Sequence, residues 1–175
     1  MGVFALFKVG DLVYYGATGV CRISDVTVRS FGNESSEYFV LRPIYDAKST
    51  LFVPKENSLL AKKIHPVLMP EEILEMVSDC EDAEEVHIKE DKQRQERYKQ
   101  LVITGDRRKL ARIVKILFKR REEMNAAGKK LRMADERILK EAERLLYDEI
   151  SLSFKIERGQ VIPFLFGEIK PEPKQ

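Results

Sequence analysis

The sequence predicts an α+β protein, in which a small antiparallel β-barrel is followed by a compact all-helical domain. In the first third of the chain, short segments rich in Val, Ile, Tyr, Phe and Thr alternate with turn residues, as the strands of a small sheet do. From about residue 70 onwards, apolar residues repeat at helical spacing instead. These two observations predict a β domain at residues 1–64, a helical domain at 65–155 and a C-terminal tail at 156–175.

The predicted strands are the segments DLVYYG, VCRISDVTVRSF, EYFVLRPIY and STLFVP. Turn residues at 31–36 and 45–49 separate them, and Pro54 ends the last strand because proline has no N–H to donate to a neighbouring strand. Strands this short and this closely spaced favour a strongly bent barrel. Side chains alternate along a strand, so we expect one of Tyr14 and Tyr15 in the core and the other at the surface.

Four helices are predicted, over the segments PEEILEMV, IKEDKQRQERYKQLV and RRKLARIVKILFKRREEM and over residues 131–150. Pro70 suits the first turn of the first helix, Gly105 breaks the second, and Asp106 caps the third. In the tail, Phe164 and Phe166 are expected to fold back onto the helices. The alternative is that this apolar stretch is a docking peptide.

The third predicted helix is amphipathic and carries a stripe of basic residues. Its apolar positions follow the i, i+3, i+4, i+7 pattern of a buried face: Leu110, Ile113, Val114 and Leu117. A separate set, which we call the basic stripe, follows i, i+4, i+7, i+11: Arg108, Arg112, Lys115 and Lys119. Like charges at this spacing repel one another. The stripe therefore favours a phosphate-facing role over the alternative of an ordinary solvated face.

Composition and motifs exclude several classes of protein. With 43% hydrophobic and 34% charged residues and a net charge of +2, the chain is a folded, non-membrane protein. Its N-terminus is a poor signal peptide, and Cys21 and Cys80 give no disulfide framework, so we predict a cytoplasmic location. Cys80 and His87 form no zinc pattern, and nucleophile, P-loop and dinucleotide motifs are missing. We predict no enzyme activity, no cofactor and no metal.

Several motifs, in order and spacing, resemble the CarD/CdnL family of bacterial transcription regulators, whose N-terminal module is shared with the transcription-repair coupling factor. In the β domain they are F-K-V-G-D-L-V-Y-Y at 7–15, Gly19, E-Y-F-V-L at 37–41 and V-P-K-E-N at 53–57. In the helical domain they are R-Y-K at 97–99, G-D at 105–106, R-I-V-K-I-L at 112–117, Leu131, Arg137, Leu139, Ala142, Leu146 and Glu149. The resemblance runs from about residue 7 to residue 152.

The resemblance implies a fold and a function. The N-terminal module is expected to be a Tudor-like, SH3-like barrel that binds the lobe of the RNA polymerase β subunit by strand addition at a sheet edge. The helical domain is expected to contact double-stranded promoter DNA at the upstream fork of the −10 region. The factor then modulates the stability of the open complex, acting as a monomer within it, in the cytoplasm and associated with the nucleoid.

The resemblance also assigns residues to each partner. The expected polymerase contacts are Arg29, Val40, Leu41, Phe52 and Pro54. The residues expected to bind DNA, which combine positions carried over from the family with the basic helical residues, are Arg94, Arg97, Lys99, Arg108, Arg112, Lys115, Lys119 and Arg120.

One departure from the family keeps a second function open. Arg94 stands where well-studied members place a tryptophan that wedges into the minor groove, and this chain has no tryptophan. Arginine enters a narrow minor groove electrostatically but does not prop open a base step. Glu96 and Glu136 also replace residues that are often basic. The alternative function is therefore a polymerase-binding adaptor with little or no direct DNA contact.

Overall fold

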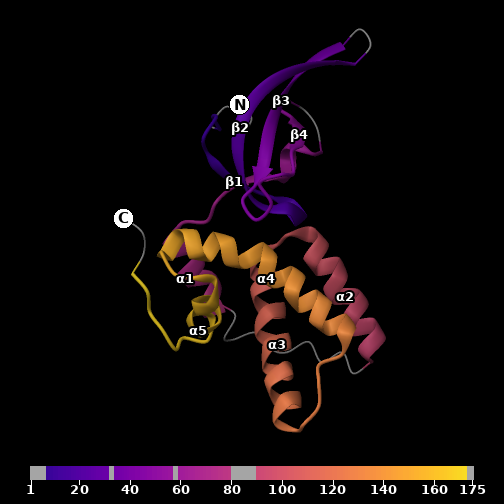
Figure 1. Cartoon of the computed structure of the whole chain (residues 1–175), viewed down its shortest axis with the longest axis vertical. Helices are drawn as coiled ribbons and strands as arrows, with labels where there is room; N and C mark the ends of the chain where they lie inside the picture. Colours follow the sequence, from indigo (N-terminus) through magenta and orange to yellow (C-terminus); the bar gives the residue numbers. More distant parts are fainter. Residues whose placement is uncertain (1–6, 32–33, 57–58, 80–89, 173–175) are drawn as a thin grey trace. The chain divides into compact units, whose positions relative to one another are not determined.

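The fold combines an antiparallel sheet with a helical bundle, as the sequence predicts. The computed structural model describes residues 7–31, 34–56, 59–79 and 90–172 (Figure 1). The chain divides into two compact units, Met1–Val67 and Leu68–Gln175. Within these described residues, every strand belongs to the first unit and every α-helix to the second.

The first unit is a five-stranded antiparallel sheet. Its strands lie in the order β4-β3-β2-β1-β5. They are β1 (Leu12–Tyr15), β2 (Gly19–Phe31), β3 (Glu34–Pro43), β4 (Leu51–Pro54) and β5 (Ile64–Pro66). Short 3₁₀ turns at Gly16–Thr18 and Ala61–Lys63 precede β2 and β5.

The expected closure of this sheet into a barrel is wrong. β4 and β5 lie at opposite edges, and no pairing joins them within the described residues. Closure requires the edge strands to meet over several residues. Here β5 has only three residues, all paired with β1, and β4 has four, all paired with β3. A register shift between Ile23 and Asp25 bends β2, so the sheet curves without closing.

One face of the sheet forms the core of the first unit. Its buried side chains are Val13, Tyr15, Cys21, Ile23, Phe39, Leu41, Val53 and Ile64. Tyr14 points to the other face, yet only 1% of it is exposed. The expectation that one of the two neighbouring tyrosines lies at the surface is therefore wrong. Gly19 adopts φ 84°, a left-handed conformation that glycine accepts without strain where the chain turns into β2.

The β2–β3 hairpin is longer than the rest of the sheet. β1 pairs with β2 only up to Arg22, and β4 pairs with β3 only from Tyr38 to Leu41. Figure 1 shows the two long strands extending beyond their short neighbours. The far half of the hairpin is thus a two-stranded ribbon.

The second unit is built around its longest helix, α4 (Met133–Phe154). α4 packs against the other four helices, which are α1 (Pro70–Asp79), α2 (Asp91–Thr104), α3 (Arg107–Ala126) and α5 (Val161–Leu165). A 3₁₀ turn at Arg158–Gln160 leads into α5. The helix termini follow the predicted signals: α1 begins at Pro70, Gly105 ends α2 in a left-handed conformation, and the Asp106 carboxylate accepts a hydrogen bond from the Lys109 N–H.

The end of the chain packs against the bundle. Phe164 is buried and its ring centroid lies 4.9 Å from that of Phe154. The ring centroids of Phe166 and Phe118 lie 5.6 Å apart. The expectation that these two aromatic residues fold back onto the helices is confirmed. No helix in the described parts of the chain is long and apolar enough to span a membrane.

Candidate functional site

Four of the five residues expected to contact polymerase share one face of the sheet. Because side chains alternate along a strand, Val40, Phe52 and Pro54 lie opposite the core residues Phe39 and Val53. Arg29 lies on that same side of β2 and reaches Phe52. We call the surface made by Arg29, Tyr38, Val40, Phe52 and Pro54 the outer face.

A cation–π contact organises the outer face. The Arg29 guanidinium carbon stands 3.4 Å from the centroid of the Phe52 ring, so the two side chains stack across β3. Phe52 is 37% exposed, whereas Val40 between the strands is 8% exposed. The contact fixes a flat apolar ring and a charge together on a surface open to a partner.

Leu41 does not belong to this surface. Its side chain is fully buried in the sheet core, and the backbone of β3 is paired on both sides at Val40 and Leu41. The expectation that the Leu41 side chain contacts a partner is contradicted by this position. The edge of the sheet on this side is β4, which carries Phe52 and Pro54 and, among the strands of the described residues, pairs only with β3.

The basic stripe lies on the solvent side of α3. At 100° per residue, its four positions fall within a narrow sector, roughly opposite the buried residues of the helix. Within the described part of the chain, Arg112 and Lys119 make no ion pair and are exposed. The Lys115 ammonium stands 5.6 Å from the Phe166 ring, so the C-terminal segment positions it.

Two other predicted DNA contacts are held by carboxylates. Arg108 forms ion pairs with Glu75 and Asp79 of α1. The Arg120 Nη2 lies 3.4 Å from Asp91 Oδ1. Both guanidiniums remain partly exposed. A phosphate at either guanidinium would have to compete with these carboxylates, whereas Arg112 and Lys119 have no such competitor among the described residues.

Arg94 is inside the helical unit, not on its surface. Only 4% of the residue is exposed. Its Nη2 lies 3.0 and 2.7 Å from the two carboxylate oxygens of the fully buried Asp135, and its Nη1 donates to Asp91. This placement contradicts the expectation that Arg94 contacts DNA, because a guanidinium committed to two carboxylates in the interior presents no charge to a groove.

Asp91 connects Arg94 to the surface. The Asp91 carboxylate accepts from Arg94 and also pairs with Arg120 and Arg132. The hydrogen bond from Arg94 is the main cause that lowers the pKa of Asp91, and the charges of Arg132 and Arg120 act in the same direction. No local sequence pattern indicates this cluster, because its members come from three helices and a loop.

A second buried carboxylate anchors the start of the helical unit. Both Glu149 oxygens accept from Arg107, at 3.0 and 3.1 Å, and one of them accepts from the backbone N–H of Leu68 at 2.8 Å. The Ser153 hydroxyl donates to the Leu68 carbonyl at 3.2 Å. Burial raises the pKa of Glu149, against the opposing effect of Arg107. Glu149 was part of the family pattern, but its structural role was not predicted.

Arg97 and Lys99 do not form a single surface. Two residues apart on a helix, they point to nearly opposite sides of α2, about 160° apart. Lys99 lines a groove between α2 and α4. On α3, Lys119 and Arg120 line a separate hollow of about 500 Å³ that also includes Lys129 and Glu123. Within the described ranges, no three His, Cys, Asp or Glu side chains group as metal ligands would.

Two domain families match the chain in sequence. Residues 7–68 match the CarD-like/TRCF RID domain. Residues 72–165 match the CarD C-terminal domain. The chain belongs to the CarD family. The CarD C-terminal match extends beyond the resemblance noted from the sequence, which ended near residue 152, and it includes α5.

Membership of the CarD family assigns a general function. CarD-like proteins are non-enzymatic transcription factors, and their N-terminal module interacts with RNA polymerase. This protein is therefore an RNA polymerase-interacting transcription regulator. Within that general function, the outer face and the basic stripe are its two candidate binding surfaces.

Proposed function

We propose that this CarD-family protein bridges the polymerase β subunit and promoter DNA near the upstream edge of the −10 region, and so modulates the stability of the open complex. The observation that carries the proposal is the unpaired part of the basic stripe. Arg112, Lys115 and Lys119 project from the solvent side of α3 without a carboxylate partner among the described residues. Stability alone does not favour such a run of like charges, whereas a phosphate backbone does.

The polymerase contact is proposed to lie on the outer face and the adjoining β4 edge. The unpaired side of β4 offers backbone groups for strand addition, and the Arg29–Phe52 stack offers a charge and an apolar ring beside it. The β lobe is the partner that the family resemblance implies. Arg22 and Arg42, which pair across β2 and β3 and are exposed, extend the positive charge along the outer face.

The polymerase contact is tested by the binding of two outer-face variants, one charge reversal and one truncation, to the polymerase core enzyme. Arg29→Glu and Phe52→Ala are each expected to weaken binding about tenfold or more, as truncation of a central anchor does. Val28→Thr is the matched control, because Val28 is the neighbour of Arg29 but lies on the opposite face. Equal loss in all three variants, or in none, would contradict an interface on the outer face.

The DNA contact is tested with a triple variant, Arg112→Glu, Lys115→Glu and Lys119→Glu. Polymerase binding is expected to remain, while the effect of the protein on open-complex lifetime is lost. Lys140→Glu, an exposed charge on α4, is the control. If the triple variant changes open-complex lifetime as the wild-type protein does, the basic stripe does not contact DNA.

A second candidate function is favoured by one observation, the burial of Arg94. Without an apolar wedge or a charge at that position, the protein acts as a polymerase-binding adaptor with little DNA contact. Photo-crosslinking from position 115 in a polymerase–promoter complex separates the two functions. Crosslinks to DNA support the bridging function, and crosslinks to protein alone support the adaptor.

A further inference from the structure

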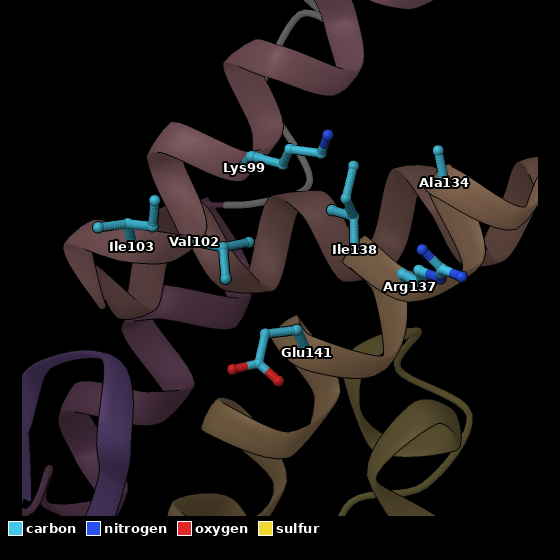
Figure 2. Close-up of a pocket in the computed structure, with 7 residues that line it drawn as sticks. All are labelled: Lys99, Val102, Ile103, Ala134, Arg137, Ile138 and Glu141. Atoms are coloured by element: carbon cyan, nitrogen blue, oxygen red, sulfur yellow. The ribbon is translucent and has the colours of Figure 1, made fainter.

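The helical unit contains an apolar groove that neither candidate surface uses. It has a volume of about 340 Å³ and lies between the C-terminal half of α2 and the N-terminal half of α4. Its apolar lining consists of Val102, Ile103, Ala134 and Ile138. Figure 2 shows that α2 and α4 each supply both apolar and charged side chains to the groove. Ile103 is 64% exposed, which is unusual for an isoleucine.

The groove carries an excess of positive charge, because its one carboxylate is already paired. Glu141 is already engaged, because its two oxygens accept from Arg144 Nε and Nη2 at 3.0 and 2.5 Å. Lys99 and Arg137 make no ion pair among the described residues, and both are exposed. The groove therefore presents two uncompensated positive charges beside an apolar surface.

This combination fits a protein segment better than nucleic acid. Phosphates would meet Lys99 and Arg137 but would gain nothing from the aliphatic lining. Nucleobases stack most strongly on aromatic rings, and none of the seven lining residues is aromatic, so Arg137 is the one lining side chain on which a base could stack. A helix or extended segment with aliphatic side chains flanked by carboxylates satisfies both parts of the surface.

We propose that the α2–α4 groove binds an acidic amphipathic segment of a partner protein. One or two aliphatic side chains of that segment enter between Val102, Ala134 and Ile138 and cover Ile103. Its carboxylates pair with Lys99 and Arg137. Lys99, which the family resemblance assigns to DNA, then contacts protein instead. Because the groove is small, we expect weak binding, about micromolar, as is typical of a transient contact.

The test is an NMR titration of the full-length protein with a synthetic helical peptide that carries Leu at i, i+3 and i+7 and Glu at the flanking positions. We expect chemical-shift changes centred on Val102, Ile103, Ala134 and Ile138. The double variant Lys99→Glu, Arg137→Glu is expected to weaken binding about tenfold or more. A peptide with Lys in place of Glu is then expected to bind the double variant better than the wild-type protein.

One further disruptive variant and one control make the test specific. Ile103→Asp, at an exposed position that should not affect folding, removes the apolar contact and is expected to abolish peptide binding. Lys140→Glu changes an α4 charge that does not line the groove and is expected to leave binding unchanged. Circular dichroism verifies that each variant is folded.

Three outcomes would overturn the proposal. The first is the absence of shifts in the groove at millimolar peptide. The second is binding that Ile103→Asp and the charge reversals leave unchanged. The third is a short DNA duplex that shifts the same four residues and loses its binding in the Lys99→Glu, Arg137→Glu variant, which would make the groove a DNA contact.

Discussion

Arg94 shows how one side chain changes the role of a position. The family resemblance places an exposed tryptophan wedge there, but here the guanidinium is buried against Asp135 and Asp91. A buried guanidinium requires carboxylate partners, and Asp135, fully buried on α4, supplies one. Arg94 therefore joins α2 to α4, and any DNA contact must come from other residues.

The first prediction concerns this buried pair. Asp135→Ala leaves the Arg94 charge in the interior without its main partner, so the free energy of unfolding is expected to fall by about 3–5 kcal/mol. Urea denaturation followed by circular dichroism measures the change. The double variant Arg94→Met, Asp135→Leu removes both charges and is expected to recover most of the loss. A loss below about 1 kcal/mol for Asp135→Ala would mean that the pair does not form.

The second prediction concerns Glu149 and pH. Because burial raises the pKa of Glu149 in the folded protein, the folded state holds this proton at a pH where the unfolded state has released it. Ionising Glu149 therefore costs stability, and its contribution is expected to fall as pH rises above the ordinary carboxyl pKa of about 4.3. Glu149→Gln removes the ionisable group and with it this pH-dependent contribution to the free energy of unfolding. We measure the free energy of unfolding by urea denaturation from pH 4 to 7. Its slope against pH is expected to be more positive in the variant than in the wild-type protein. Identical slopes would contradict the raised pKa of Glu149.

At the scale of elements, α5 is an integral part of the bundle. It has only five residues, yet Val161 and Leu165 are fully buried and Phe164 is 4% exposed. An isolated helix of this length is not stable in water, so tertiary packing holds it in place. The position of Phe166 beside Phe118 and Lys115 depends on α5 as well.

The third prediction tests α5. Phe164→Ala is expected to lower the free energy of unfolding by about 3–5 kcal/mol, because it opens a cavity against Phe154. Glu168→Ala, at an exposed position three residues after α5, is the control and should change stability little. Thermal and urea denaturation measure both variants. Equal stability of the two variants would show that α5 is not packed in solution.

At the scale of the whole molecule, the two units are joined where Val67 meets Leu68. The Leu68 backbone is fixed to α4 by Glu149 and Ser153, so the point at which the chain enters the helical unit is defined. If the protein bridges two partners, the short connection keeps the second binding surface at a high effective concentration once the first is bound.

The fourth prediction follows from that connection. A flexible Gly/Ser insertion of about eight residues between Val67 and Leu68 is expected to leave polymerase binding unchanged and to reduce the effect on open-complex lifetime. The same insertion appended after Gln175 is the control. Filter binding and promoter-complex decay measure the two quantities. An adaptor that acts through polymerase alone would tolerate the insertion without loss.

The order and type of the elements could be predicted from the amino-acid sequence alone, because they depend on local chemistry. Alternating β-branched and aromatic residues specified the strands, and helical periodicity with Pro70, Gly105 and Asp106 specified the helices and their ends. The same periodicity placed the basic stripe on one side of α3, opposite its buried face. Family motifs distributed along the chain were also readable without a structure.

Which side chains contact one another became known from the three-dimensional structure, because these contacts join residues far apart in the chain. That structure left the sheet open, placed Arg29 over Phe52 and buried Leu41. It also paired Arg94 with Asp135, 41 positions later, which no local pattern encodes. From sequence alone, a charged residue is predicted to be exposed, because water solvates its charge. It can be buried only where a partner of opposite charge replaces that water, and the local sequence does not reveal such a partner.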